Sequence, residues 1–77
     1  MGAVSKLQAR CNAWNLANPV GTLVSLRRNI GDPTITRTRS EAQILSGHSA
    51  VVWLEGVRGY YDLDWVTPLY ELKLEYV

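Results

Sequence analysis

Short apolar stretches separated by turn residues make up most of this chain. Between Val20 and Leu69, residues of the Gly, Pro, Asn and Ser type break the sequence at 29–33, 46–48, 55–59 and 67–68. Regularly spaced short strands with Gly and Pro between them are typical of a small β-barrel or sheet. No apolar stretch is long enough to predict a large α/β unit.

The first seventeen residues carry a different period and predict a helix over residues 5–17. Leu7, Cys11 and Trp14 recur at helical spacing and form one apolar stripe. Ser5, with Gln8 three residues later, matches a capping box at the start of a helix. Asn18 and the proline that follows it predict the end of the helix.

Alternating and β-branched segments predict the strands. In residues 20–28 the apolar positions fall mainly on one face, and residues 34–39 are rich in Thr. Ala50–Leu54 is the most apolar stretch and is expected to be the central strand. Gly56 and Gly59 predict a tight hairpin into a strand over residues 60–63.

The segment after Arg39 leaves two alternatives open. Ser40 and Gln43 repeat the capping-box spacing, which predicts a short helix over residues 41–46 that ends at Gly47. Alternatively, the preceding strand runs on through Gln43–Leu45. The segment is too short for periodicity to decide between them.

The last eight residues, 70–77, alternate most regularly and predict an extra C-terminal strand. Its apolar face could cover the open end of a barrel or pack on the helix stripe. It could also pair with a second copy and form a homo-oligomer. The side chains of that face are the possible oligomer contacts: Tyr70, Leu72, Leu74 and Tyr76.

Length and composition predict one soluble domain over residues 1–77. The 77 residues are 47% hydrophobic, which suffices for one compact core but makes an enclosed substrate cavity improbable. Cys11 is the only cysteine, so no internal disulfide can form. No apolar run has the length of a signal peptide or of a membrane span, so we expect a cytoplasmic protein without membrane association.

Charge is unevenly divided along the chain. Residues 1–39 contain six basic side chains and one acidic side chain, a balance of +5, whereas residues 40–77 contain two basic and six acidic ones, a balance of −4. The halves could pair with each other inside the fold. Alternatively, the first half could present a basic face to a polyanion or to an acidic protein.

The closing part of the chain resembles an SH3-like barrel. Residues 51–57 contain an apolar strand and the start of a Gly turn, and residues 59–69 continue with a strand, a turn at Asp64–Val66 and a final short strand. The resemblance implies a mainly β fold in which residues 20–69 form a small barrel of about five to six short antiparallel strands. The helix over residues 5–17 would precede this barrel.

Three stretches are also similar to small uncharacterised proteins carried by bacterial prophages and other mobile elements. They are Thr38–Ala42, the pair Gly47-His48 and Leu63–Leu69. This likeness implies a mobile-element origin and carries no activity with it.

Catalytic and metal chemistry have little support in the residue types. Cys11 and His48 could form a nucleophilic dyad, but a thiol on an apolar helix stripe is usually inert packing. Asp62 and Asp64, on one strand face, could bind a cation with Glu55, but paired acids at a strand end are common. No Gly-rich phosphate loop is present. We therefore predict no catalytic residues, no metal and no cofactor.

Arginines are the strongest binding candidates. If the first two strands form a hairpin, Arg27 or Arg28 would lie near Arg37 across the ladder, and such a cluster needs an offsetting anion. That anion could be an internal carboxylate from Glu41, Glu55 or Asp62, a phosphate backbone or an acidic protein. The candidate binding residues are Arg27, Arg28, Arg37 and Arg39, and the candidate aromatic contact surface is Tyr60, Tyr61 and Trp65.

The sequence thus predicts a non-enzymatic binding module of phage or mobile-element origin. We expect a macromolecular partner, and a host protein in preference to nucleic acid. Nucleic-acid binding through the arginines is the first alternative. Base stacking there would require exposed aromatic rings beside the arginines. The second is an oligomeric enzyme whose site lies at a subunit interface.

Overall fold

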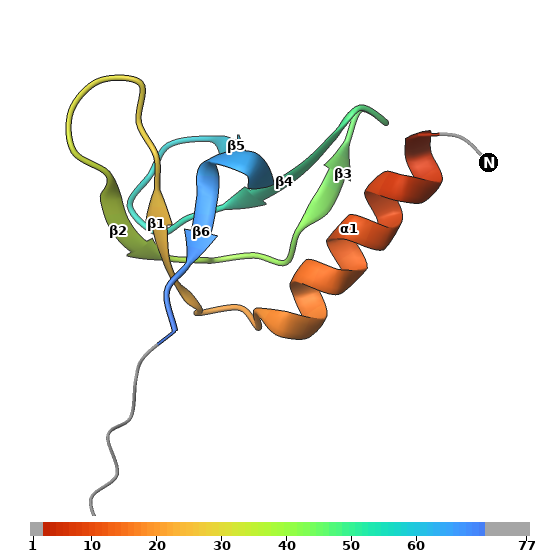
Figure 1. The fold of residues 1–77 in the computed structure, drawn as a ribbon, viewed down its shortest axis with the longest axis horizontal. Coiled ribbons are helices and arrows are strands. Elements are labelled where there is room, and N and C mark those ends of the chain that lie inside the picture. Colours follow the sequence, from red (N-terminus) through yellow and green to blue (C-terminus); the bar gives the residue numbers. More distant parts are fainter. Residues whose placement is uncertain (1–2, 71–77) are drawn as a thin grey trace, which may run out of the picture.

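The computed structural model describes residues 3–70, which form one α-helix, six short strands and one 3₁₀ turn (Figure 1). In chain order these elements are α1 (Ala3–Ala17), β1 (Leu23–Leu26), β2 (Thr34–Arg37), β3 (Gln43–Leu45), β4 (Ser49–Trp53), β5 (Tyr60–Asp62), η1 (Leu63–Trp65) and β6 (Val66–Pro68). Within these residues no helix has the length and apolar character needed to cross a membrane.

The strands form two three-stranded antiparallel sheets, in the orders β2-β1-β6 and β3-β4-β5. An isolated bridge between Thr38 and Leu54 joins the sheets at one corner. There the Arg39 N–H donates to the Trp53 carbonyl and the Glu55 N–H donates to the Arg37 carbonyl, each at 2.9 Å. The predicted mainly β fold with one N-terminal helix is confirmed, and each sheet is open.

The core lies where the two sheets and α1 meet. Val24 and Leu26 of β1 are fully buried, as the alternation in the first segment predicted. β4 is the middle strand of its sheet, and its three central residues are buried on both faces. The prediction of a central strand is therefore confirmed. α1 packs against β3 and β4, and Cys11 belongs to the core cluster.

Several predicted boundaries were wrong. The helix begins at Ala3, so Ser5 lies within its first turn and not before it. The first two strands are shorter than expected, and the 3₁₀ turn is Leu63–Trp65 rather than Asp64–Val66. Its cap is the carboxylate of Asp62, which accepts from the Asp64 N–H at 2.8 Å.

Neither alternative for the segment after Arg39 holds in full: residues 43–45 are a strand, but β2 ends at Arg37 and this strand belongs to the other sheet. β3 occupies Gln43–Leu45, and the short helix over 41–46 is absent from the described residues. Ser40 does not cap a helix: its hydroxyl accepts from the Trp53 N–H at 3.1 Å and donates to the Glu41 carbonyl at 3.0 Å. Its side chain therefore joins this segment to the end of β4.

One side chain fixes α1 to the sheet. The Asn15 amide donates to the Ala42 carbonyl at 3.1 Å, and its oxygen accepts from the Ala42 N–H at 2.7 Å. Ala42 is buried and directly precedes β3. Because one amide satisfies both backbone groups, Asn15 takes the place that a neighbouring strand would have at this residue.

The turn between β3 and β4 contains the one left-handed residue other than glycine among the described residues. Ser46 has a φ of 53° and Gly47 a φ of 71°, while the His48 N–H donates to the Leu45 carbonyl at 3.0 Å. Two successive positive φ values are the requirement of a type I′ hairpin turn, which favours Asn-Gly.

Substitutions in this turn are expected to change stability in opposite directions. Ser46→Asn should raise the free energy of unfolding by about 0.5 kcal/mol, because Asn tolerates the left-handed region better than Ser. Gly47→Ala should lower it by about 1 kcal/mol, since alanine is strained at this φ. Urea denaturation of both variants measures the two changes, and a loss of stability in Ser46→Asn would contradict the expectation.

Candidate functional site

An open groove of about 490 Å³ lies between the loop that follows β1 and the β5–η1 segment. It brings together two of the predicted arginines and all three predicted aromatic residues. Its lining residues are Arg27, Arg28, Asn29, Ile30, Tyr60, Tyr61, Asp62 and Trp65.

Arg27 connects the two walls of the groove. Its backbone N–H donates to the Trp65 carbonyl at 2.8 Å, which ties the end of β1 to η1. Its guanidinium carbon lies 4.6 Å from the centre of the Trp65 ring, within the range of a cation–π contact. The arginine is exposed, so its charged group is held at the surface on an aromatic support.

The next residues of the loop form the outer rim. The Arg28 Nε donates to the Thr34 hydroxyl across the base of the loop at 2.9 Å. Ile30 is 91% exposed, and Gly31 follows with a φ of 87°, a value that favours glycine and lets the chain turn back toward β2. The loop therefore presents an aliphatic side chain to solvent beside two guanidinium groups.

Aromatic rings line the opposite wall to different depths. Tyr60 is 49% exposed, and its ring meets that of Trp53 edge to face, with centroids 5.8 Å apart. Tyr61 and Trp65 are half-buried and pack against the core cluster. Of the predicted aromatic surface, Tyr60 thus offers the most ring area to a ligand.

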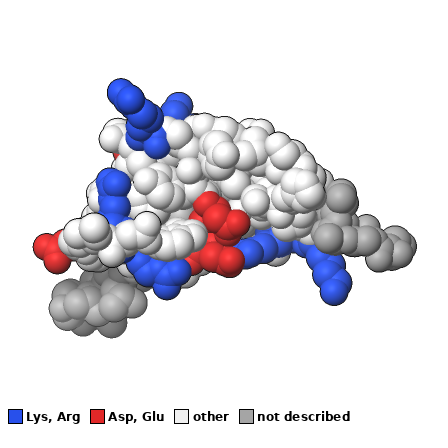
Figure 2. Space-filling model, turned by 90° about the horizontal axis from the view of Figure 1, so that it is seen from above, with Lys and Arg blue, Asp and Glu red and all other residues white. Residues whose placement is uncertain are grey.

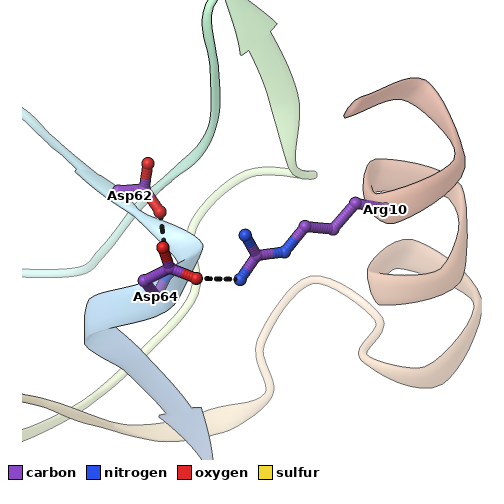
Figure 3. A network of polar contacts seen from close by, with 3 residues as sticks. All are labelled: Arg10, Asp62 and Asp64. Atoms are coloured by element: carbon purple, nitrogen blue, oxygen red, sulfur yellow. Dashed lines mark hydrogen bonds and ion pairs between the residues drawn. The ribbon is translucent and has the colours of Figure 1, made fainter. Parts of the chain in front are cut away.

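Acidic residues near the groove are engaged within the fold (Figure 3). Asp62 caps η1, and Asp64 forms an ion pair at 2.6 Å with Arg10, which reaches across from α1. The two acids do not share a strand face, because Asp62 ends β5 and Asp64 lies in η1. Within residues 3–70, no group of three or more metal-ligating side chains is close enough to hold a metal ion.

The four predicted arginines do not form one cluster. The register pairs Leu23 with Arg37 and Leu26 with Thr34, so Arg37 lies at the far end of the hairpin from Arg27 and Arg28. The expected approach of these arginines across the ladder was therefore wrong. Arg37 donates to the Gly21 carbonyl at 2.9 Å, and the Arg39 Nε donates to the Leu54 carbonyl at 3.2 Å.

Internal carboxylates do not neutralise these arginines in the part of the chain that is described. The ion pair between Arg10 and Asp64 is the one found there, and it joins the basic half of the sequence to the acidic half. Figure 2 shows basic and acidic side chains scattered over one face, with wide uncharged areas between them. This face carries no continuous basic surface of the kind that follows a phosphate backbone.

Cys11 and His48 lie in different environments. Cys11 is 1% exposed in α1, and burial raises the pKa of its thiol, although the Arg10 charge acts in the opposite direction. A buried thiol with a raised pKa is a poor nucleophile. His48 is exposed in the turn between β3 and β4, on a different element from Cys11.

The predicted C-terminal strand and most of its oligomer contacts lie outside the described residues. Leu72, Leu74 and Tyr76 belong to that part of the chain. Tyr70 is described: it is 69% exposed, and its hydroxyl donates to the Asn18 side-chain oxygen at 3.3 Å.

Sequence reasoning missed Ile30 as a site residue. It stands in the turn segment 29–33, among residues of turn-forming type, where an aliphatic β-branched side chain has no core to fill. That contrast is the signal that could have identified it.

Comparisons with protein families, with curated proteins and with solved structures find no match to this chain.

Proposed function

We propose that this protein is a small, non-enzymatic binding module that holds a protein partner in the groove between Arg27 and Tyr60. The observation that carries the proposal is the position of two exposed large hydrophobic residues, Ile30 and Tyr60, on the lining of one hollow. Exposed apolar side chains gathered at a concave site are typical of interaction surfaces. Aromatic and arginine side chains are also the types that contribute most to protein interfaces.

An SH3-like barrel is part of this proposal. β1 pairs with both β2 and β6, and the 3₁₀ turn η1 connects β5 to β6. The corner bridge between Thr38 and Leu54, which links the two open sheets, supports this part of the proposal. A mobile-element origin and a host protein as the partner also belong to the proposal, and the origin rests on the resemblance of residues 38–42, 47–48 and 63–69 alone.

Selection from a random peptide library displayed on phage tests this function. The wild-type protein should enrich peptides that bind it, and Ile30→Ser should weaken their binding by roughly tenfold, since about 1.4 kcal/mol of apolar contact is lost. Leu16→Ser is the matched control, because Leu16 is also an exposed aliphatic residue, at 89%, but lies on α1.

Two outcomes would contradict the proposal. Either the library yields no binder, or its binders are weakened equally by Ile30→Ser and Leu16→Ser. Thermal unfolding of both variants should match wild type, because each replaced side chain is exposed. This control separates loss of binding from loss of folding.

A further inference from the structure

We infer that the groove selects an extended, acidic segment of the partner, in which carboxylates flank one large apolar side chain. This inference rests on the proposed function and names the chemistry of the partner. It is carried by the charges of the loop that follows β1, by the contacts that hold them and by the remaining wall of the groove.

The first step is the charge of Arg27 and Arg28. Both side chains are exposed on the groove, and neither has a carboxylate within 4.0 Å among residues 3–70. A guanidinium is a planar fork of five N–H donors that matches a carboxylate in geometry. Two such groups on adjacent residues therefore form a receptor for carboxylates that the described part of the fold leaves unfilled.

The second step is that both guanidinium groups are already held in place. The Arg27 group lies over the Trp65 ring, and the Arg28 Nε donates to the Thr34 hydroxyl at 2.9 Å. Each contact restrains a long side chain and leaves terminal N–H donors for a ligand. Binding then loses less side-chain entropy than it would with free arginines.

The third step separates a peptide from a nucleic acid. The Arg27 guanidinium covers a face of the Trp65 ring, so that face is not open for a base to stack on. Asp62 also lines the groove, and its negative charge repels a ligand with evenly spaced phosphates. A peptide can place its carboxylates at the arginines and a neutral side chain beside Asp62.

The fourth step is the apolar contact. Ile30, in the loop that follows β1, and Tyr60, in β5, are both exposed and both line the groove. An aliphatic or aromatic side chain between them would remove apolar surface of both residues from water. The same ligand can therefore use the charged rim and the apolar walls at once.

A labelled peptide series tests the inference by fluorescence anisotropy. The probe is fluorescein-labelled Gly-Ser-Glu-Leu-Glu-Glu-Gly-Ser, and the matched peptide carries Gln in place of each Glu. We expect the acidic probe to bind at least roughly tenfold more tightly at low salt, because two arginine–carboxylate contacts contribute. Raising NaCl from about 0.05 M to about 0.3 M should reduce this preference through screening.

Two double variants locate the effect. Arg27→Gln with Arg28→Gln should abolish the preference for the acidic probe. Arg37→Gln with Arg39→Gln removes the same charge at the other end of the hairpin and should leave the preference intact. Circular dichroism at the assay temperature verifies that both double variants are folded.

The results distinguish failure of the inference from failure of the proposed function. Equal binding of the Glu and Gln peptides overturns the inference, while library peptides that depend on Ile30 leave the proposed function standing. A preference that disappears in both double variants also overturns it, because net charge alone would then explain the effect. Tighter binding of a thymidine oligonucleotide than of any peptide overturns both.

Discussion

Replacing Leu54 with alanine is expected to lower the free energy of unfolding by about 2–5 kcal/mol. Leu54 is completely buried, and its backbone forms the bridge to Thr38 that joins the two sheets. Alanine would leave a cavity at this junction. The two sheets are joined there by the bridge, so they cannot move freely to fill the cavity. For a domain of this size, the loss is a large part of the total stability.

Thermal and urea denaturation measure this effect. The midpoint of thermal unfolding should fall by roughly 8–40 °C, given about 4–8 °C per kcal/mol for a small domain. Leu16→Ala makes the same chemical change at an 89% exposed position of α1, and it should alter stability by less than about 0.5 kcal/mol. Equal effects of the two substitutions would show that the Leu54 side chain does not contribute to the core.

Asn15→Ala is expected to cost about 1–3 kcal/mol, although it removes little apolar surface. The substitution deletes the amide that bonds both backbone groups of Ala42, a buried residue. In the variant, the buried N–H and C=O of Ala42 would have neither the Asn15 amide nor water as a hydrogen-bond partner. These unsatisfied groups account for the larger part of the lost stability. We expect α1 to detach from the sheet more readily as a result.

Hydrogen exchange and denaturation together test this role. The Ala42 amide should exchange much faster in Asn15→Ala, and the free energy of unfolding should fall. Asn12→Ala is the matched control, because Asn12 is an exposed residue of α1. Among the described residues, its side chain accepts one hydrogen bond, from the Gln8 side chain at 3.0 Å. An Ala42 amide that stays protected in Asn15→Ala would refute the proposed attachment.

The strands were predictable where burial leaves a period in the sequence. Val24 and Leu26 alternate because they face the core, and β4 is a continuous apolar run because it is covered on both sides. Boundaries were not predictable where long-range hydrogen bonds decide them. Ser40 has the spacing of a helix cap, yet its hydroxyl bonds to Trp53, which is distant in sequence, and β3 forms instead of a helix.

The candidate site was predictable in its residue types but not in its grouping. Arginines and aromatics were identified separately, and the structure places Arg27 and Arg28 at the groove and Arg37 at the opposite end of the hairpin. The register of β1 and β2 depends on the length of the loop between them, which the sequence does not fix. Asp64 likewise looked like a possible ligand, whereas its actual partner, Arg10, comes from the helix.

The Asn15 contact has a consequence for how this protein behaves at high concentration. β3 is an outer strand of its sheet, and an uncovered outer strand can recruit a strand from another molecule. Because Asn15 of the helix bonds both backbone groups of Ala42, these groups are not available to another strand at the start of β3. A chain whose helix has come loose would therefore be prone to aggregate before it is fully denatured.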